Sequence, residues 1–404
     1  MRKNSLISNS HFHYILLIPL VNLALTPIQS RLIGPEMIGL QQSFTSLIGI
    51  VIIFTTLKLE TLIFQTNESI DQVKYANAAL SLAFRMSILL GAGVMLYWLF
   101  SYDKEIVTLL ELMILVPIIL FLYSIDNIRK VQQVRNDEAK RYYRLTFIRN
   151  IFKNLLLIVI ALFAKINFTI ILIVETIYRV PGVLGQLKKM HFNGFNSKFL
   201  VHLTSNPKVT YIYSISLLIN SLTAGWPLIL IQQTNPQVGG EYAMYFRLFA
   251  LPAMLISTFF SEQFSGSKES GRQLSFKLIL LLVISGIFCL LMMFIPRELY
   301  TFILGESWGG IYAIAFNLGT SLSLEIFFSA VSIYLILDNS MNMKYLMDIV
   351  LLAVSISPFF FPVKLEHQIF LMNLLKSISL GVFILLIYKK HIHSRVWNSR
   401  NNFS

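Results

Sequence analysis

The sequence predicts an all-α polytopic membrane protein with twelve transmembrane helices in two similar halves. Composition, the length of the apolar runs and a weak internal repeat are the three observations that predict it. Hydrophobic residues make up 55% of the 404 residues and charged residues only 13%, and the mean hydropathy is +0.68. A soluble domain of this size is much more polar. Apolar and polar residues do not alternate along the runs, which argues against a membrane β-barrel.

Twelve apolar runs approach or exceed the roughly 20 residues that cross a bilayer as a helix. Short loops separate them. The first run follows Arg2 and Lys3, as in a cleaved signal peptide, but eleven further runs behind it favour a retained helix. The runs cover residues 12–30, 38–63, 78–100, 107–125, 145–164, 167–187, 209–231, 242–261, 274–295, 310–337, 345–363 and 366–388.

An internal repeat links residues 31–72 to residues 232–273, at an offset of 201. Each stretch opens with a turn, continues with an apolar run and ends in a polar loop. Two apolar helices with turn residues at the same end would also look alike, but here the register holds without a gap. The repeat predicts two pseudo-symmetric lobes. The identical pairs are Pro35/Pro236, Gly39/Gly240, Leu47/Leu248, Glu68/Glu269, Ser69/Ser270 and Gln72/Gln273.

The expected organisation is an N-terminal lobe at 1–190 (spans one to six), a cytoplasmic linker at 191–208 and a C-terminal lobe with a basic tail at 209–404. The stretches 126–144 and 188–208 are the longest expected outside the membrane. Lys and Arg concentrate in the loops on the side of the N-terminus, which places both termini in the cytoplasm. The opposite side holds only Arg31, Lys104, Lys165, Arg297 and Lys364.

The net charge of +13 therefore reflects topology and contact with anionic headgroups. Its spread over many loops argues against a nucleic-acid partner. The single cysteine, Cys289, cannot form an intramolecular disulfide, and the seven histidines lack the spacing of metal ligands. No GxxxxGK[ST] loop is present. The sequence thus predicts no metal, no cofactor and no ATP hydrolysis.

Charged residues inside the predicted spans are the candidate functional residues, because a charge near the bilayer centre costs roughly 2.5–3.5 kcal/mol and usually faces a cavity or a partner. Cations outnumber anions, which suits an anionic substrate, and Arg matches phosphate well. The candidate substrate-binding residues are Lys58, Arg85, Arg149, Lys153, Arg179, Arg247 and Lys376. The candidate ion-coupling residues are Glu60, Glu325 and Asp348.

Each of these candidates also has a structural interpretation. Lys58, Glu60, Arg149 and Asp348 lie near the cytoplasmic ends of their spans, where a long side chain can reach the interface. Glu175 and Arg179 are four residues apart on one helix face and can neutralise each other. A structural salt bridge between Glu325 and Lys376 competes equally with a role in coupling or binding.

Three stretches resemble the polysaccharide-export flippases of the Wzx type, in the multidrug/oligosaccharidyl-lipid/polysaccharide exporter superfamily. They are RLIGPEMIGL (31–40), TTLKLETLIF with NESIDQ (55–72), and PRELYTFILGESWGGIYAIAFNL (296–318). The number of spans, the paired lobes and the length extend the resemblance over essentially the whole chain. The matching positions are Gly34, Pro35, Glu36, Gly39, Leu59, Glu60, Arg297, Glu298, Leu299, Gly305, Glu306 and Trp308.

The resemblance implies two six-helix lobes around a central cavity that opens to either side of the membrane in turn. It implies a non-enzymatic protein of the bacterial cytoplasmic (inner) membrane. Its cargo would be an undecaprenyl-pyrophosphate-linked oligosaccharide for O-antigen or a related surface polysaccharide. The implied partners are this lipid-linked cargo, membrane lipids, and the polymerase and chain-length proteins of the same pathway.

Two alternatives remain. A multidrug exporter of the same superfamily often carries an acid in its first helix, whereas span one here has Asn22 and Gln29 but no Asp or Glu. A membrane polysaccharide polymerase would need a large outer loop with catalytic residues, and the outer loops here are short.

Overall fold

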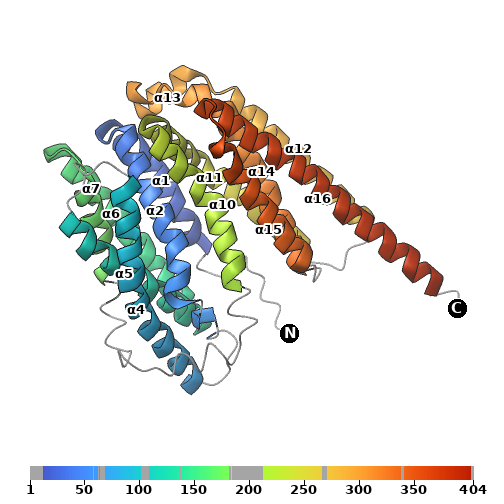
Figure 1. Cartoon of the computed structure of the whole chain (residues 1–404), viewed down its shortest axis with the longest axis horizontal. Coiled ribbons are helices and arrows are strands. Elements are labelled where there is room, and N and C mark those ends of the chain that lie inside the picture. Colours follow the sequence, from blue (N-terminus) through green and yellow to red (C-terminus); the bar gives the residue numbers. More distant parts are fainter. Residues whose placement is uncertain are drawn as a thin grey trace. The chain divides into compact units, whose positions relative to one another are not determined.

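The computed structural model describes residues 12–57, 59–61, 63, 69–101, 109–136, 138–181, 183, 213–265, 271–337 and 341–401. These residues are helical apart from short turns (Figure 1). The first half contains α1 (Phe12–Leu32), α2 (Pro35–Thr56), α4 (Ser69–Ser101), α5 (Leu109–Arg135), α6 (Ala139–Phe163) and α7 (Phe168–Ile177). The second half contains α10 (Tyr213–Thr234), α11 (Pro236–Ser265), α12 (Gly271–Met293), α13 (Arg297–Leu304), α14 (Ile311–Leu337), α15 (Met341–Ile356) and α16 (Leu365–Asn401).

Each of the twelve predicted apolar runs overlaps one of these helices, although α7 covers only part of the run 167–187, and the short α13 is additional. Within the described residues, seven helices are long and apolar enough to cross a membrane. The number becomes eight if α12 and α13, which are bent by 78° at their junction, count as one broken span. The chain is therefore an all-helical, multi-pass membrane protein, and the full set of twelve spans stays a prediction.

The stretch 126–144, expected to lie outside the membrane, is helical at both ends. α5 continues to Arg135 and α6 begins at Ala139, so only a short turn connects them. Asp126 and Arg129 are buried. Asp126 pairs with Arg149 of α6, and the Arg129 guanidinium lies 6.0 Å from the ring of Tyr142 on the same helix. The stretch is thus mostly helical, and its placement outside the membrane stays a prediction.

Two helix starts follow the offset of the sequence repeat. α2 and α11 begin at Pro35 and Pro236, which are 201 positions apart. Proline suits the first turn of a helix, because its φ is helical and its missing N–H would have no partner there.

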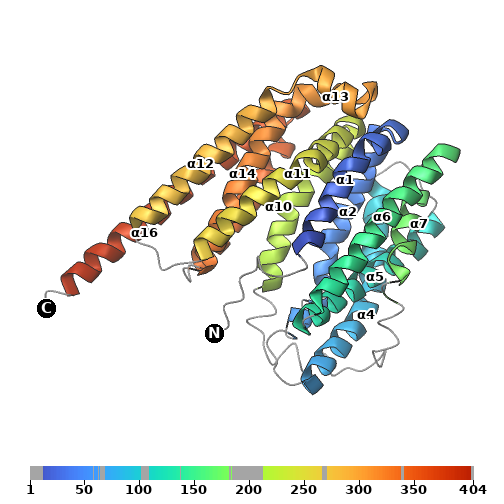
Figure 2. The same cartoon turned by 180° about the vertical axis from the view of Figure 1, so that it is seen from behind.

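The described residues form two compact units, one up to Gly240 and one from Glu241 onward. In the first unit α10 packs along α2, and α1 packs along α6 (Figures 1 and 2). The core of this unit includes Phe44 and Ile48 of α2 and Phe168 of α7, and the rings of Phe44 and Phe168 meet edge to face. The predicted linker at 191–208 lies outside the described residues, and the predicted lobe boundaries stay a prediction.

In the second unit α14 is the central element. It packs against α12 and α16, and α15 packs against α16. Trp308, in the turn before α14, is fully buried. Gly309 and Gly310 in the same turn lie against the Arg297 guanidinium and the Glu241 carboxylate, so a side chain at Gly310 would clash with Glu241. The Gly-Glu-Ser-Trp-Gly-Gly stretch thus has a local packing role.

The corner between α1 and α2 and the corner between α10 and α11 touch through glycines. A β-carbon on Gly240 would lie 1.9 Å from the carbonyl oxygen of Pro35, and one on Gly39 would lie 2.0 Å from Oε1 of Gln232. The Gln232 side chain donates to the carbonyl of Glu36 at 3.2 Å. Gly39 and Gly240 are one of the six identical pairs of the repeat, and their lack of side chains lets the corners approach.

Candidate functional site

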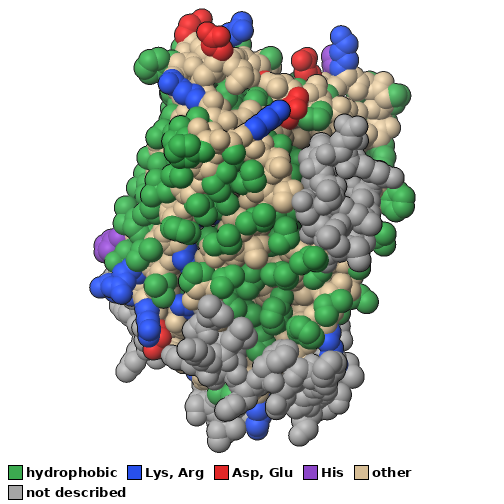
Figure 3. Space-filling view, turned by 90° about the vertical axis from the view of Figure 1, so that its left-hand side faces the viewer, with side chains coloured by type: hydrophobic (Ala, Val, Ile, Leu, Met, Phe, Trp, Pro, Cys, Tyr) green, Lys and Arg blue, Asp and Glu red, His purple; other side chains and the backbone are tan. Residues whose placement is uncertain are grey.

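From Ile148 onward, helix α6 has its polar side chains buried or half-buried, and many of its apolar side chains are exposed. Ile148, Phe152, Leu155, Val159 and Leu162 are exposed, at the spacing of one helix face. Figure 3 shows a broad apolar band on one face of the molecule, with charged side chains gathered toward both ends. A helix that exposes apolar residues and buries polar ones is adapted to lipid as its solvent.

The inner face of α6 carries two of the predicted cations, and both are paired with carboxylates on neighbouring helices. Arg149 donates to Asp126 of α5 at 3.0 Å, and Lys153 forms an ion pair with Glu175 of α7. Arg179, just after α7, lies 3.8 Å from Asp126 and 3.9 Å from Glu175. We call these five side chains the charged cluster.

Tyrosines surround the charged cluster. The Arg179 guanidinium stacks 3.2 Å from the ring centroid of Tyr123, on α5. Lys153 lies 5.1 Å from the ring of Tyr178. The Tyr142 hydroxyl donates to Asp126 at 3.3 Å. Aromatic faces stabilise cations in a water-poor environment, so the cluster combines ion pairs with cation–π contacts.

The charged cluster has three cations and two anions. Arg149 and Arg179 are 8% and 7% exposed. Within the described residues, Nε and Nη1 of Arg149 and Nε of Arg179 have no hydrogen-bond partner. Leaving buried donors unsatisfied costs free energy, and an anion placed there would satisfy both the extra charge and the free N–H groups.

A network of amides joins the other side of α6 to α1. Asn22 Oδ1 accepts hydrogen bonds from Asn150 and Asn154, each at 2.8 Å. Gln29 donates to Asn154 at 3.0 Å. The sequence drew attention to Asn22 and Gln29 only as the polar residues of span one. The sequence did contain a signal for their partners: Asn150 and Asn154 are four residues apart and therefore lie on one face of α6.

Glu325 and Lys376 lie in the second unit, on α14 and α16, and interact electrostatically. Lys376 is 3% exposed. Glu325 also interacts with Tyr242 of α11. The other predicted anion of this unit, Asp348, is buried and paired with Lys344 one turn earlier on α15. Each acidic candidate of this unit thus interacts with a cation.

The remaining predicted residues are distributed over other helices. Arg85 is half-buried on α4, and Arg247 is half-buried on α11 in the second unit. Glu60 is buried in the short helical turn that follows α2. Lys58 lies outside the described residues. Of the seven cations predicted to share a cavity, the structure brings Arg149, Lys153 and Arg179 together in the first unit. It adds Asp126, which the sequence analysis placed in a stretch outside the membrane.

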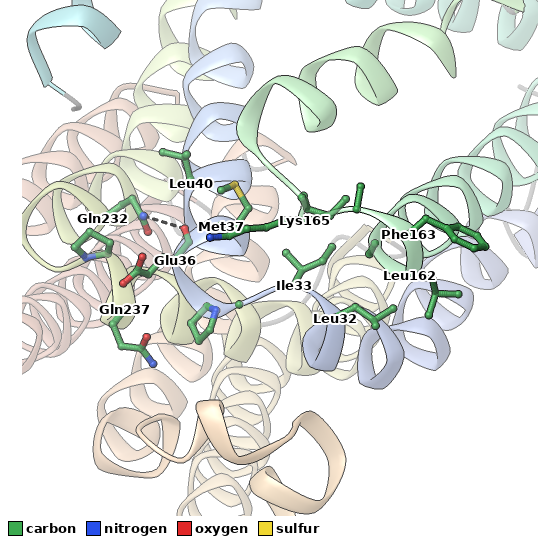
Figure 4. Close-up of a pocket in the computed structure, with 16 residues that line it drawn as sticks. Leu32, Ile33, Glu36, Met37, Leu40, Leu162, Phe163, Lys165, Gln232 and Gln237 are labelled. Atoms are coloured by element: carbon green, nitrogen blue, oxygen red, sulfur yellow. Dashed lines mark hydrogen bonds between the residues drawn. The ribbon is translucent and has the colours of Figure 1, made fainter. Parts of the chain in front are cut away.

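A pocket of about 770 Å³ opens at one end of the first unit, among the α1–α2, α6–α7 and α10–α11 corners (Figure 4). Apolar side chains, among them Ile33, Met37 and Phe163, form much of its lining. Glu36 and Lys165 bring one charge of each sign, and Gln232 adds an amide. The pocket is therefore amphipathic and has no net charge among these residues.

Comparison with known proteins supports a fold assignment. No family model matches the chain, and no curated protein sequence gives a significant match. A solved structure described as the inward-facing conformation of a multidrug resistance MATE family transporter of the MOP superfamily matches with a TM-score of 0.59. The match covers 94% of this chain and 98% of the other, at 12% sequence identity. The chain therefore has the MATE-like fold of that superfamily.

Proposed function

We propose that the protein is a non-enzymatic MOP-superfamily transporter that moves an undecaprenyl-pyrophosphate-linked oligosaccharide across the bacterial cytoplasmic membrane. The MATE-like fold supports transport as the general activity, because transporters of this kind expose one site to the two sides of the membrane in turn. The charged cluster is the observation that favours an anionic cargo.

The charged cluster favours an anion through its charge and its free donors. Its two arginines are buried, they make three cations with Lys153 against two carboxylates, and they retain N–H groups that have no hydrogen-bond partner among the described residues. Guanidinium groups bind phosphate oxygens in pairs of parallel hydrogen bonds. In a site with little water such a contact is much stronger than at a surface. A pyrophosphate supplies the missing acceptors and charge.

Deletion of the gene in its native bacterium, followed by complementation, tests this proposal. Complementation with the double variant Arg149→Gln/Arg179→Gln should fail to restore surface polysaccharide, and complete lipid-linked repeat units should accumulate facing the cytoplasm. The matched control is Arg141→Gln, which removes the same chemical group from the exposed face of α6 and should restore wild-type polysaccharide.

Two other outcomes would contradict the proposal. Unchanged polysaccharide with altered drug sensitivity would indicate a multidrug transporter, the function named for the structural match. Single units that reach the outer surface but are never extended would indicate a polymerase. The sign of the buried charge argues against an exporter of cationic drugs, because the charged cluster would repel them.

A further inference from the structure

The pocket at the end of the first unit has a different chemical character from the charged cluster. Its lining holds one ammonium group, one carboxylate and amides, and the other lining residues are largely apolar. Figure 4 shows Gln232 and Glu36 close together on α10 and α2, with the Lys165 side chain extending from the α6–α7 turn toward α2. Charges of opposite sign across a small pocket do not favour a strongly anionic ligand.

We infer that this pocket binds a neutral sugar ring. A sugar offers hydroxyl groups that both donate and accept hydrogen bonds, and it has an apolar face of C–H groups. The Glu36 carboxylate can accept from a hydroxyl, whereas the Lys165 ammonium group can only donate to one. Phe163, which is 88% exposed and lines the pocket, supplies an aromatic surface for the C–H face.

The dimensions and the position of the pocket agree with this ligand. Its volume lies within the roughly 300–1,000 Å³ of small-molecule sites, and a mainly apolar lining with a few placed polar groups is typical of them. It opens at the corners that the distribution of Lys and Arg assigns to the side opposite the cytoplasm. The inference rests on the proposed function in one respect: the sugar would be part of the transported oligosaccharide, reaching this pocket on the outer side.

Fixed backbone geometry holds the pocket in shape. Gln232 is 2% exposed, donates to the Glu36 carbonyl and fits against the bare Cα atoms of Gly39 and Gly239. This packing positions the start of α2, and with it Glu36, relative to α10. Rigid support of this kind is what a weakly bound ligand such as a sugar needs, because little binding free energy is then lost to ordering the protein.

Direct binding of free sugars to the full-length protein in lipid nanodiscs tests the inference. The probes are glucose, galactose, rhamnose and N-acetylglucosamine, measured by saturation-transfer NMR. The pocket variant is Glu36→Gln/Lys165→Met. The matched control is Glu366→Gln/Lys364→Met, since Glu366 also lies in the first turn of a helix and both control residues are exposed.

At least one sugar should bind the wild-type protein and the control, and its affinity for the pocket variant should fall at least tenfold. Equal binding to all three proteins, or binding to none, would overturn the inference. So would a pocket variant that changes only the phospholipids retained on purification, because the pocket would then be a lipid site. The complementation experiment with Arg149 and Arg179 tests the proposed function independently of this inference, because neither arginine lines the pocket.

Discussion

Arg149 on α6 and Asp126 on α5 are joined by a buried hydrogen-bonded ion pair of 3.0 Å. Both residues are only 8% exposed. The pair does not stand alone, because Asp126 also accepts from Tyr142 and lies near Arg179. One carboxylate thus connects α5, α6 and the end of α7. Its removal should weaken the packing of all three segments.

Asp126→Asn should destabilise the protein by about 3 kcal/mol, because removing one partner of a buried ion pair leaves the other charge uncompensated. Unfolding in detergent micelles, followed by circular dichroism, measures the change. Glu138→Gln is the control: Glu138 pairs with Arg141 at 3.9 Å on the exposed surface, and its loss should cost at most about 0.5 kcal/mol. Similar losses for the two variants would contradict the structure.

Gly240→Ala should be destabilising by roughly 1–3 kcal/mol or more, because the new methyl group overlaps the backbone carbonyl of Pro35 and the corners must separate. Gly49→Ala is the matched control. Gly49 lies within α2, where an added β-carbon would meet no atom within 4 Å, and alanine should stabilise the helix by about 0.5–1 kcal/mol. Thermal unfolding of the two variants should move in opposite directions from the wild type.

Tyr123→Leu should lower stability by about 1–2 kcal/mol, since it removes the aromatic face under the desolvated Arg179 guanidinium. Tyr123→Phe keeps the ring and should retain most of that contribution. Equilibrium unfolding of both variants, repeated in an Arg179→Gln background, isolates the pair. If leucine and phenylalanine have the same effect, the stacked contact contributes nothing measurable.

Glu325→Gln and Lys376→Met should each destabilise the second unit more than the double variant does, because each single change leaves one buried charge without its counterpart. The coupling free energy in a double-mutant cycle should be at least about 0.5 kcal/mol, as expected for two buried charges of opposite sign that interact electrostatically. Additive effects would show that the two side chains act independently and would favour separate roles for them in coupling and binding.

The periodic features of this fold were predictable from sequence. The twelve apolar runs and the proline-led corners depend on local chemistry, and helices begin at Pro35 and Pro236 as the turn residues indicate. The repeat had a detectable signal for a different reason: the close approach of the two corners requires glycine at both 39 and 240.

The pairing of the charges was not predictable. Asp126 follows an apolar run and precedes Arg129 and Lys130, which is the usual pattern of a helix end facing water. Only the packing of α5 against α6 shows that Arg149 neutralises it. Glu175 was assigned to Arg179 by its spacing, whereas its closer partner is Lys153 on another helix. Contacts between distant segments leave no periodic signal in a single sequence.

The packing of α10 along α2 has a consequence for biosynthesis. Thr56, where α2 ends, and Tyr213, where α10 begins, are 157 positions apart. At about 5–20 residues per second, a ribosome needs roughly 8 to 31 s to synthesise the intervening chain. During that time lipid must cover the α2 surface that α10 later occupies. α2 is apolar enough to be covered by lipid in this interval, because Glu36 in its first turn is the only charged residue along its length.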